Sequence, residues 1–74
     1  MKEQIKELLE NSLPLVDFDS DFLFAELDSL GIAQIMMLLS EEYHIQLDFT
    51  DATPKNFKSV DSLAAMVSSK LSGN

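Results

Sequence analysis

The stretch from Leu30 to Leu39 is the most apolar part of the chain, and it limits the possible folds more than any other segment. Ser40-Glu41-Glu42-Tyr43 closes it. Asp28 stands just before it and can act as an N-cap, because its carboxylate can accept from amides that have no partner within a helix. We therefore predict a central helix that begins at Ser29 and ends at Tyr43. Since it is apolar on nearly all sides, we expect other elements to cover it.

Two further helices flank this segment in the sequence. Residues 2–13 carry an apolar stripe among Lys, Glu and Gln, which predicts an amphipathic helix that stops before Pro14. Ser59 caps a last helix, and Gly73 follows it as a stop signal. The apolar groups of this last helix repeat at helical spacing. They are Val60, Leu63, Ala64, Val67 and Leu71.

The connections carry weaker signals. Residues 14–27 show no single period but many apolar groups, so we expect a long loop that lies over the core. The alternation over residues 44–49 is too short to pair as a strand, which favours an extended connection. Thr53 before Pro54 predicts a cap and one helical turn through Phe57. The predicted fold is all-α, a small four-helix bundle of three main helices and one short helix, in a single domain over residues 1–74.

Composition excludes several classes of function. Without cysteine, the chain has no disulfide, zinc cluster or thiol nucleophile of its own. A net charge of −8 disfavours nucleic acid and anionic membranes as partners, and it favours proteins that present Lys and Arg. A chain of 74 residues leaves little room for the enclosed pocket of an enzyme. We expect a non-enzymatic monomer.

The sequence also indicates where the protein resides. No apolar segment of a signal peptide follows Met1-Lys2-Glu3-Gln4. The central apolar run falls well short of the roughly 20 residues that a membrane span requires. We therefore expect a cytoplasmic protein without a membrane span.

Two motifs that suggest metal or acid–base chemistry are weak. Residues 17–21 and Asp28 imitate the ligand spacing of a calcium-binding loop, but Phe22 stands where the sharp bend requires glycine. His44 is the sole histidine, and one imidazole without a second nitrogen or sulfur ligand is typical of a residue that follows a helix end. We expect no metal site and no catalytic residue.

Ser29 is the residue with the clearest chemical potential. Its hydroxyl would lie beside free amides at the positive end of the helix dipole, where a phosphate is readily accommodated. Asp-Ser-Leu occurs again at residues 61–63, but there Ser59 is the better cap and Ser62 falls within the first helical turn. From local sequence alone, an attachment site at Ser29 and a simple capping pair of Asp28 and Ser29 are equally compatible.

Longer motifs resemble those of acyl carrier proteins. The resemblance rests on Leu27-Asp28-Ser29-Leu30, on the helix end Glu41-Glu42-Tyr43, and on the run from Phe57 to Ala64. It implies that Ser29 carries 4′-phosphopantetheine, transferred from coenzyme A by a phosphopantetheinyl transferase. The thiol of this arm would hold acyl groups as thioesters and move them between enzymes of fatty-acid, polyketide or related biosynthesis. These enzymes, with basic docking patches, would perform the catalysis.

The resemblance also implies a partner-binding face on the central helix. Asp28, Glu41 and Glu42 match its acidic contacts, and Leu30, Ala33 and Met37 match its apolar contacts. Where fatty-acid carriers usually have acids, this chain has other residues. They are Gly31, Gln34 and Ser40, and Gln34 is counted with the partner-binding face.

Two alternatives remain at this point. The run from Phe24 to Gly31 is also similar to D-alanyl carrier proteins and to free-standing aminoacyl or polyketide carriers. The cargo could therefore be an acyl or an aminoacyl group, loaded by the corresponding enzyme. The other alternative is an unmodified acidic helical module, which would dock a basic groove through Leu30, Met37, Glu41 and Glu42.

Overall fold

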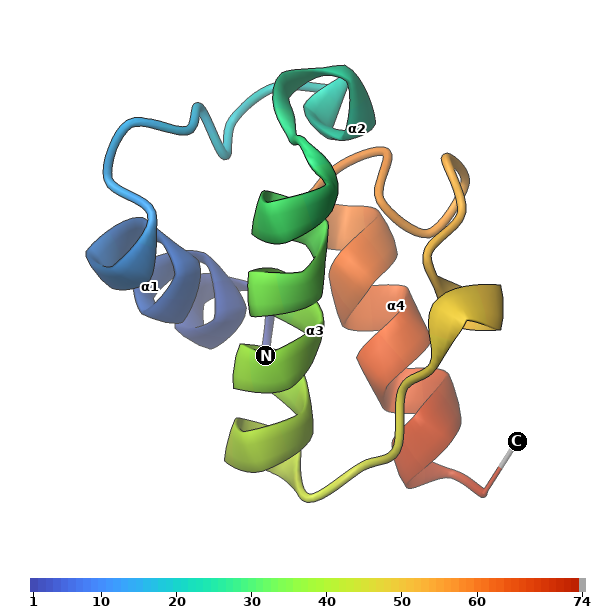
Figure 1. The fold of residues 1–74 in the computed structure, drawn as a ribbon. Helices are drawn as coiled ribbons and strands as arrows, with labels where there is room; N and C mark the ends of the chain where they lie inside the picture. Colours follow the sequence, from blue (N-terminus) through green and yellow to red (C-terminus); the bar gives the residue numbers. More distant parts are fainter. Residues whose placement is uncertain (74) are drawn as a thin grey trace.

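The computed structural model describes residues 1–73, and all regular secondary structure in this part of the chain is helical (Figure 1). The long helices are α1 (Lys2–Ser12), α3 (Ser29–Tyr43) and α4 (Val60–Leu71). Two short elements join them, α2 (Leu23–Glu26) and the 3-10 helix η1 (Phe49–Asp51). The predicted all-α fold and its three main helices are confirmed. None of the helices in residues 1–73 has the length and apolar character needed to cross a bilayer.

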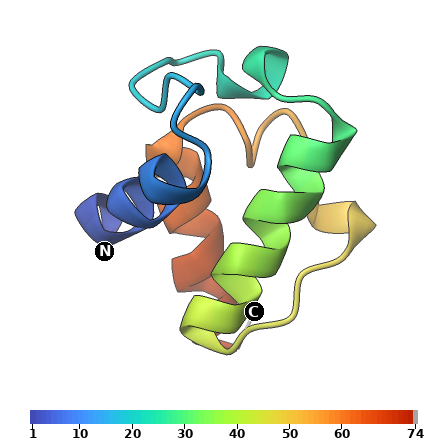
Figure 2. The same cartoon turned by 60° about the vertical axis from the view of Figure 1, so that its left-hand side comes forward.

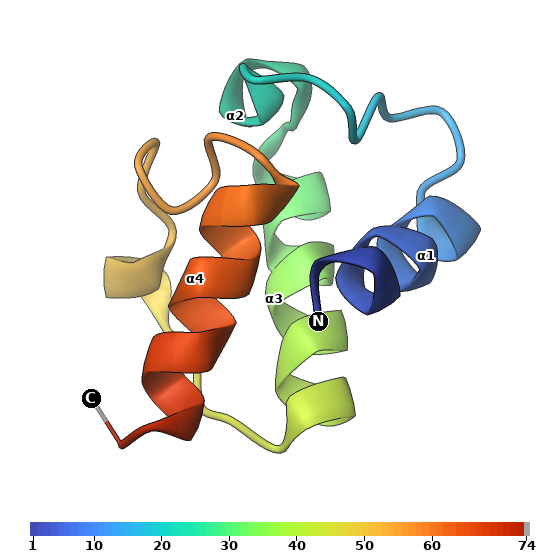
Figure 3. The same cartoon turned by 180° about the vertical axis from the view of Figure 1, so that it is seen from behind.

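The long helices pack as a pair with a third helix across it. α3 and α4 lie side by side and run in the same direction, away from the end of the molecule that carries α2 (Figures 1 and 3). α1 packs against both. Because α3 and α4 run in the same direction, the connection over residues 44–59 must return the chain to the α2 end. This return places η1 beside α3 (Figure 2).

The core is formed by apolar side chains spaced along one face of each long helix. Ile5 and Leu9 come from α1, and Ile35 and Leu39 come from α3. This four-residue spacing repeats on one face of a helix. Burial of each such side chain stabilises the fold by roughly 1.5–3 kcal/mol. The other core residues come from α2, α4 and the connections. They are Phe18, Leu23, Phe57, Val60, Leu63, Met66 and Val67.

The short elements differ from those predicted. Thr53 does begin a turn, because its carbonyl accepts from the Phe57 amide at 3.0 Å and its hydroxyl accepts from the Asn56 amide at 3.1 Å. That turn does not become a helix. The short α-helix is instead α2, within the stretch predicted to be a loop. It is held by burial of Leu23, whose amide donates to the carbonyl of Lys58 at 2.9 Å.

The loop before α2 lies over the core, as predicted, with part of its apolar side chains. Phe18 is buried in the core, and Val16 packs against it. Leu15 and Phe22, however, remain 99% and 76% exposed. Residues 14–22 therefore cover the core with only part of their apolar side chains.

Other elements cover one face of α3, and some of its apolar side chains stay exposed. Its buried residues are Gly31, Ile35 and Leu39, which define a single inward face. Leu30 and Met37 are 75% and 53% exposed. An exposed apolar surface on a helix of this length is the kind of surface that binds ligands or partners.

Candidate functional site

The N-terminus of α3 has the capped geometry that the sequence predicted. Asp28 is in an extended conformation, and its Oδ1 accepts from the Gly31 amide at 2.7 Å. The first backbone bond of the helix runs from the Ile32 amide to the Asp28 carbonyl at 3.0 Å. Ser29 is thus the first helical residue, and it is exposed. The amides of Ser29 and Leu30 precede the first intrahelical bond, so they can face a ligand.

The structure explains why residue 31 is a glycine, which the sequence alone did not reveal. It is buried, and a Cβ at this position would lie 3.2 Å from Asp28 Oδ1 and 3.4 Å from Leu27 Cδ2. The absence of a side chain lets the capping carboxylate approach the helix. An acid here would crowd that carboxylate with a like charge. Gly31 is therefore part of the cap and does not lie on an outward, partner-facing surface.

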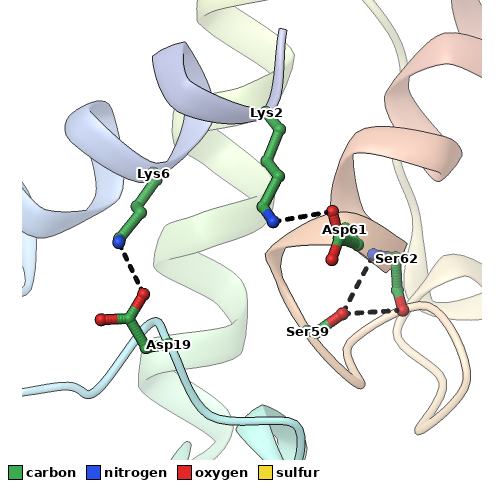
Figure 4. Close-up of polar contacts among 6 residues, drawn as sticks. All are labelled: Lys2, Lys6, Asp19, Ser59, Asp61 and Ser62. Atoms are coloured by element: carbon green, nitrogen blue, oxygen red, sulfur yellow. Dashed lines mark hydrogen bonds and ion pairs between the residues drawn. The ribbon is translucent and has the colours of Figure 1, made fainter.

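The second Asp-Ser-Leu sequence is in a different environment. The Ser59 hydroxyl accepts from the Ser62 amide at 3.3 Å, and the hydroxyls of these two residues are also 3.3 Å apart (Figure 4). Asp61 forms an ion pair with Lys2 of α1 at 3.0 Å. Ser62 is half-buried. The two serines are thus distinguished by accessibility, since Ser62 is held within a helix cap and Ser29 is exposed.

An apolar groove of about 500 Å³ begins at Ser29 and lies between α3 and residues 47–52. Its α3 wall is a stripe of residues three or four apart, the spacing that repeats on one face of a helix. This stripe consists of Ser29, Ile32, Ala33, Met36, Met37 and Ser40. The opposite wall consists of Leu47, Asp48, Phe49 and Ala52. The groove was not predicted, although the alternating apolar residues of the 44–49 connection were a signal for its second wall.

The residues assigned to the partner-binding face line two hollows beside α3 or lie in its last turn. Ala33 and Met37 line the groove with Ser29, whereas Leu30 and Gln34 line a separate hollow of about 340 Å³ beside the loop that follows α1. Glu41 and Glu42 are exposed in the last turn of α3, roughly 18–20 Å from Ser29 along the helix axis. Most of these residues follow the three- and four-residue spacing of one helix face, and their role in binding partners stays a prediction.

Ser40 belongs to the groove and not to an acidic surface. It is half-buried, and its hydroxyl donates to the Met36 carbonyl at 2.6 Å. His44 follows at the C-cap of α3 with a left-handed φ of 54° and an exposed side chain. This is the post-helical position that the sequence predicted. Residues 1–73 contain no group of three His, Cys, Asp or Glu side chains that could hold a metal ion.

The charge around the site is negative. All five basic side chains are lysines, and they lie outside residues 7–54, the segment that holds α2, α3 and η1. Three of them form ion pairs: Lys2 with Asp61, Lys6 with Asp19 at 2.6 Å, and Lys70 with Asp51 at 3.2 Å (Figure 4 shows the first two). A surface of this kind attracts cationic partners and increases their rate of encounter.

The η1 wall of the groove is fixed by a capping box. The Asp48 side chain accepts from the amide and the hydroxyl of Thr50, and the Asp51 side chain accepts from the Asp48 amide at 3.1 Å. The hydrogen bonds from Thr50 favour the charged form of Asp48 and lower its pKa. Asp48 therefore remains ionised and holds η1 in place at neutral pH.

Comparison with known proteins identifies the family. The family model for PP-binding, described as the phosphopantetheine attachment site, matches residues 1–67, which is most of the chain. Searches of curated proteins and of solved structures gave no match. Members of this family carry covalently attached 4′-phosphopantetheine and act as non-catalytic carriers that interact with transferases and biosynthetic enzymes. The chain therefore belongs to the family of phosphopantetheine-carrying proteins.

Proposed function

We propose that Ser29 is the attachment residue, and that the protein carries acyl groups as thioesters between enzymes of fatty-acid, polyketide or related biosynthesis. The observation that carries this proposal is the position of Ser29, which is exposed at the start of α3 and lines the end of an apolar groove. Ser62 lacks both properties, because it is half-buried in a cap and lines no part of that groove.

The residues around Ser29 suit a phosphodiester. The positive end of the α3 dipole and the amides of Ser29 and Leu30 favour an anionic group at this position. The Asp28 carboxylate accepts a hydrogen bond from the Gly31 amide, and this bond holds the carboxylate in the cap. When bound, the arm supplies the thiol that this cysteine-free chain lacks, and this thiol holds the cargo.

The attachment reaction is a phosphoryl transfer from coenzyme A, catalysed by a separate transferase. The Ser29 Oγ attacks the phosphorus that bears the pantetheine, so that an O–P bond forms while a P–O bond of the pyrophosphate breaks. The adenosine bisphosphate half of coenzyme A leaves, and the hydroxyl proton passes to a base of the transferase. The acidic segment around Ser29 favours a transferase with a basic docking surface.

The groove favours an apolar acyl cargo over an aminoacyl cargo. Most of its lining is aliphatic, aromatic or thioether, and Asp48 is its one charged side chain. The ammonium group of an aminoacyl thioester would lose hydration in such surroundings, and the one carboxylate there, Asp48, already accepts hydrogen bonds from Thr50. An alkyl chain would instead bury apolar surface there, at about 0.8 kcal/mol for each methylene group.

Loading of the purified protein tests the assignment of Ser29. The apo protein is incubated with coenzyme A and a broad-specificity phosphopantetheinyl transferase, and its intact mass is measured. We expect one added phosphopantetheine on the wild type and on Ser62→Ala, and none on Ser29→Ala. A thermal melt of each variant verifies that it is folded. Full modification of Ser29→Ala, or peptide mapping of the group to Ser62, would refute the assignment.

A further inference from the structure

Phe49 is an exposed aromatic residue at the edge of the groove. The residue is 94% exposed, although it is among those that line the groove. An aromatic side chain can bury about 150–250 Å² of surface, so leaving it in water forgoes a large stabilisation. Nothing in the fold of residues 1–73 uses this side chain for packing, which suggests that its burial occurs in another state of the protein.

The backbone that carries Phe49 is firmly anchored. η1 has the capping box of Asp48 and Asp51, and Asp51 also forms an ion pair with Lys70 of α4 at 3.2 Å. The Asp51 carbonyl accepts from the Asn56 side chain at 3.0 Å. Phe49 thus combines a fixed main chain with a side chain that can change rotamer. Such an arrangement permits the ring to move without remodelling the fold.

We infer that Phe49 is a cover residue, whose ring closes over an apolar acyl chain when the chain occupies the groove. The inference rests on the proposed function, in which Ser29 bears the acyl-carrying arm. Because Ser29 lines the same groove, the arm tethers its cargo close to the ring. Tethering raises the effective concentration to the millimolar range, so weak apolar contacts are enough for the chain to bind. The ring then gains a partner for burial, and the acyl chain is shielded from water.

Phe22 provides a matched control within the same chain. It is also a highly exposed phenylalanine, at 76%, but it is not among the residues that line the groove. Replacing either ring with alanine removes the same chemical group from an exposed position. Only the loss of Phe49 should change how the protein responds to its cargo. Phe49→Leu keeps apolar volume at the edge and should retain much of the response.

Thermal melts of loaded proteins test this inference. Wild type, Phe49→Ala, Phe49→Leu and Phe22→Ala are each prepared as apo, acetyl-loaded and octanoyl-loaded protein, and loading is verified by intact mass. We expect the octanoyl group to raise the melting temperature of the wild type and of Phe22→Ala above that of the acetyl form. Phe49→Ala should lose most of this chain-length-dependent increase, and its apo form should melt close to the wild type. Its octanoyl thioester should also be cleaved faster by hydroxylamine.

The outcomes distinguish the inference from the proposed function. Suppose that the wild type loads, and that Phe49→Ala matches it in both the octanoyl-dependent increase in melting temperature and the rate of thioester cleavage. Phe49 is then not a cover residue, while the carrier function stands. If Phe22→Ala loses the shift as fully as Phe49→Ala, the effect is not specific to the groove and the inference is overturned. If Ser29 takes no phosphopantetheine, both proposals are overturned.

Discussion

Asp28 caps α3 through a hydrogen bond, and we propose that its charge also contributes to recognition by partners. Its Oδ1 accepts from the Gly31 amide, and any acceptor oxygen of similar reach can do this. Attraction of a basic partner, in contrast, requires the negative charge. These two roles can be separated by substitutions that remove one property at a time.

We expect Asp28→Ala to lower the free energy of unfolding by about 1 kcal/mol, because it removes the cap of α3. Asp28→Asn keeps an acceptor oxygen and should retain most of the stability. Both variants should load phosphopantetheine more slowly than the wild type, since both lack the charge beside Ser29. Denaturant unfolding and loading rates measure the two effects. Equal destabilisation by Ala and Asn would show that charge dominates the cap, and loading at the wild-type rate would exclude a role in recognition.

Asp48 gives the η1 capping box a dependence on pH. Its pKa is lowered from the ordinary value of 3.8 by the hydrogen bonds from Thr50, so the folded state favours the carboxylate. The stabilisation is therefore present above 3.8 and is lost as the pH falls through the lower pKa of the folded state. We expect the stability difference between the wild type and Asp48→Asn to be constant near neutral pH and to shrink below 3.8. A difference that grows in acid would contradict this account.

At the scale of elements, α3 exposes both apolar and polar side chains, which should contribute differently to partner binding. Met37 lines the groove and is 53% exposed, whereas Gln34 lies in the hollow on the side of Leu30. A charge at Met37 would enter an apolar contact, but a charge at Gln34 would extend an acidic surface. The two positions therefore should respond differently to a new carboxylate.

We expect Met37→Asp to weaken binding of a phosphopantetheinyl transferase about tenfold, which corresponds to about 1.4 kcal/mol. Gln34→Glu should leave the affinity within a few-fold and act mainly on the association rate and its salt dependence. Met37→Leu serves as the control for volume. Titration calorimetry and stopped-flow kinetics with the apo protein measure these quantities. Greater damage from Gln34→Glu would show that the apolar part of α3 is not the main contact.

The sequence predicted those helices whose ends and apolar faces are determined by residues close to them in the chain. The bounds of α3 followed from the Asp28 cap and the apolar run, and those of α4 from the Ser59 cap. α2 escaped prediction because its anchor is remote in sequence, the hydrogen bond from the Leu23 amide to the Lys58 carbonyl. η1 did have a local signal in the spacing of Asp48 and Asp51, which form its capping box.

The same distinction applies to the candidate site. Ser29 and its cap could be predicted because they depend on neighbouring residues. The groove could not, since Leu47 and Phe49 reach α3 only after the chain reverses at the end of that helix. The burial of Gly31 could not be predicted either, because it depends on how α3 packs in the folded protein.

At the scale of the whole molecule, the dominant feature is an excess of negative charge. The chain has 13 acidic residues and five lysines, for a net charge of −8. The ion pairs of Lys2 and Lys6 lie largely at the surface, where such pairs contribute about 0–1 kcal/mol each, and the third joins Lys70 to the mostly buried side chain of Asp51. Mutual repulsion of the remaining acids opposes the compact state.

We expect salt to raise the melting temperature. Screening shortens the Debye length from about 30 Å at 0.01 M to about 10 Å at 0.1 M, and the latter is shorter than most distances across the molecule. Repulsion between distant acids should weaken more than attraction within the close ion pairs. Thermal melts in sodium chloride over this range measure the effect. An unchanged or lower melting temperature would mean that ion pairs outweigh self-repulsion.

The central claim is that Ser29 bears phosphopantetheine and carries an apolar acyl group. Tandem mass spectrometry of the protein purified from the cells that produce it tests this claim most directly, because it reports both the modified residue and the cargo. We predict a phosphopantetheinylated peptide containing Ser29, with an alkyl-chain acyl group on the thiol in part of the sample. An aminoacyl group would contradict the proposed cargo. Phosphopantetheine on Ser62, or a chain without it, would contradict the proposed attachment site.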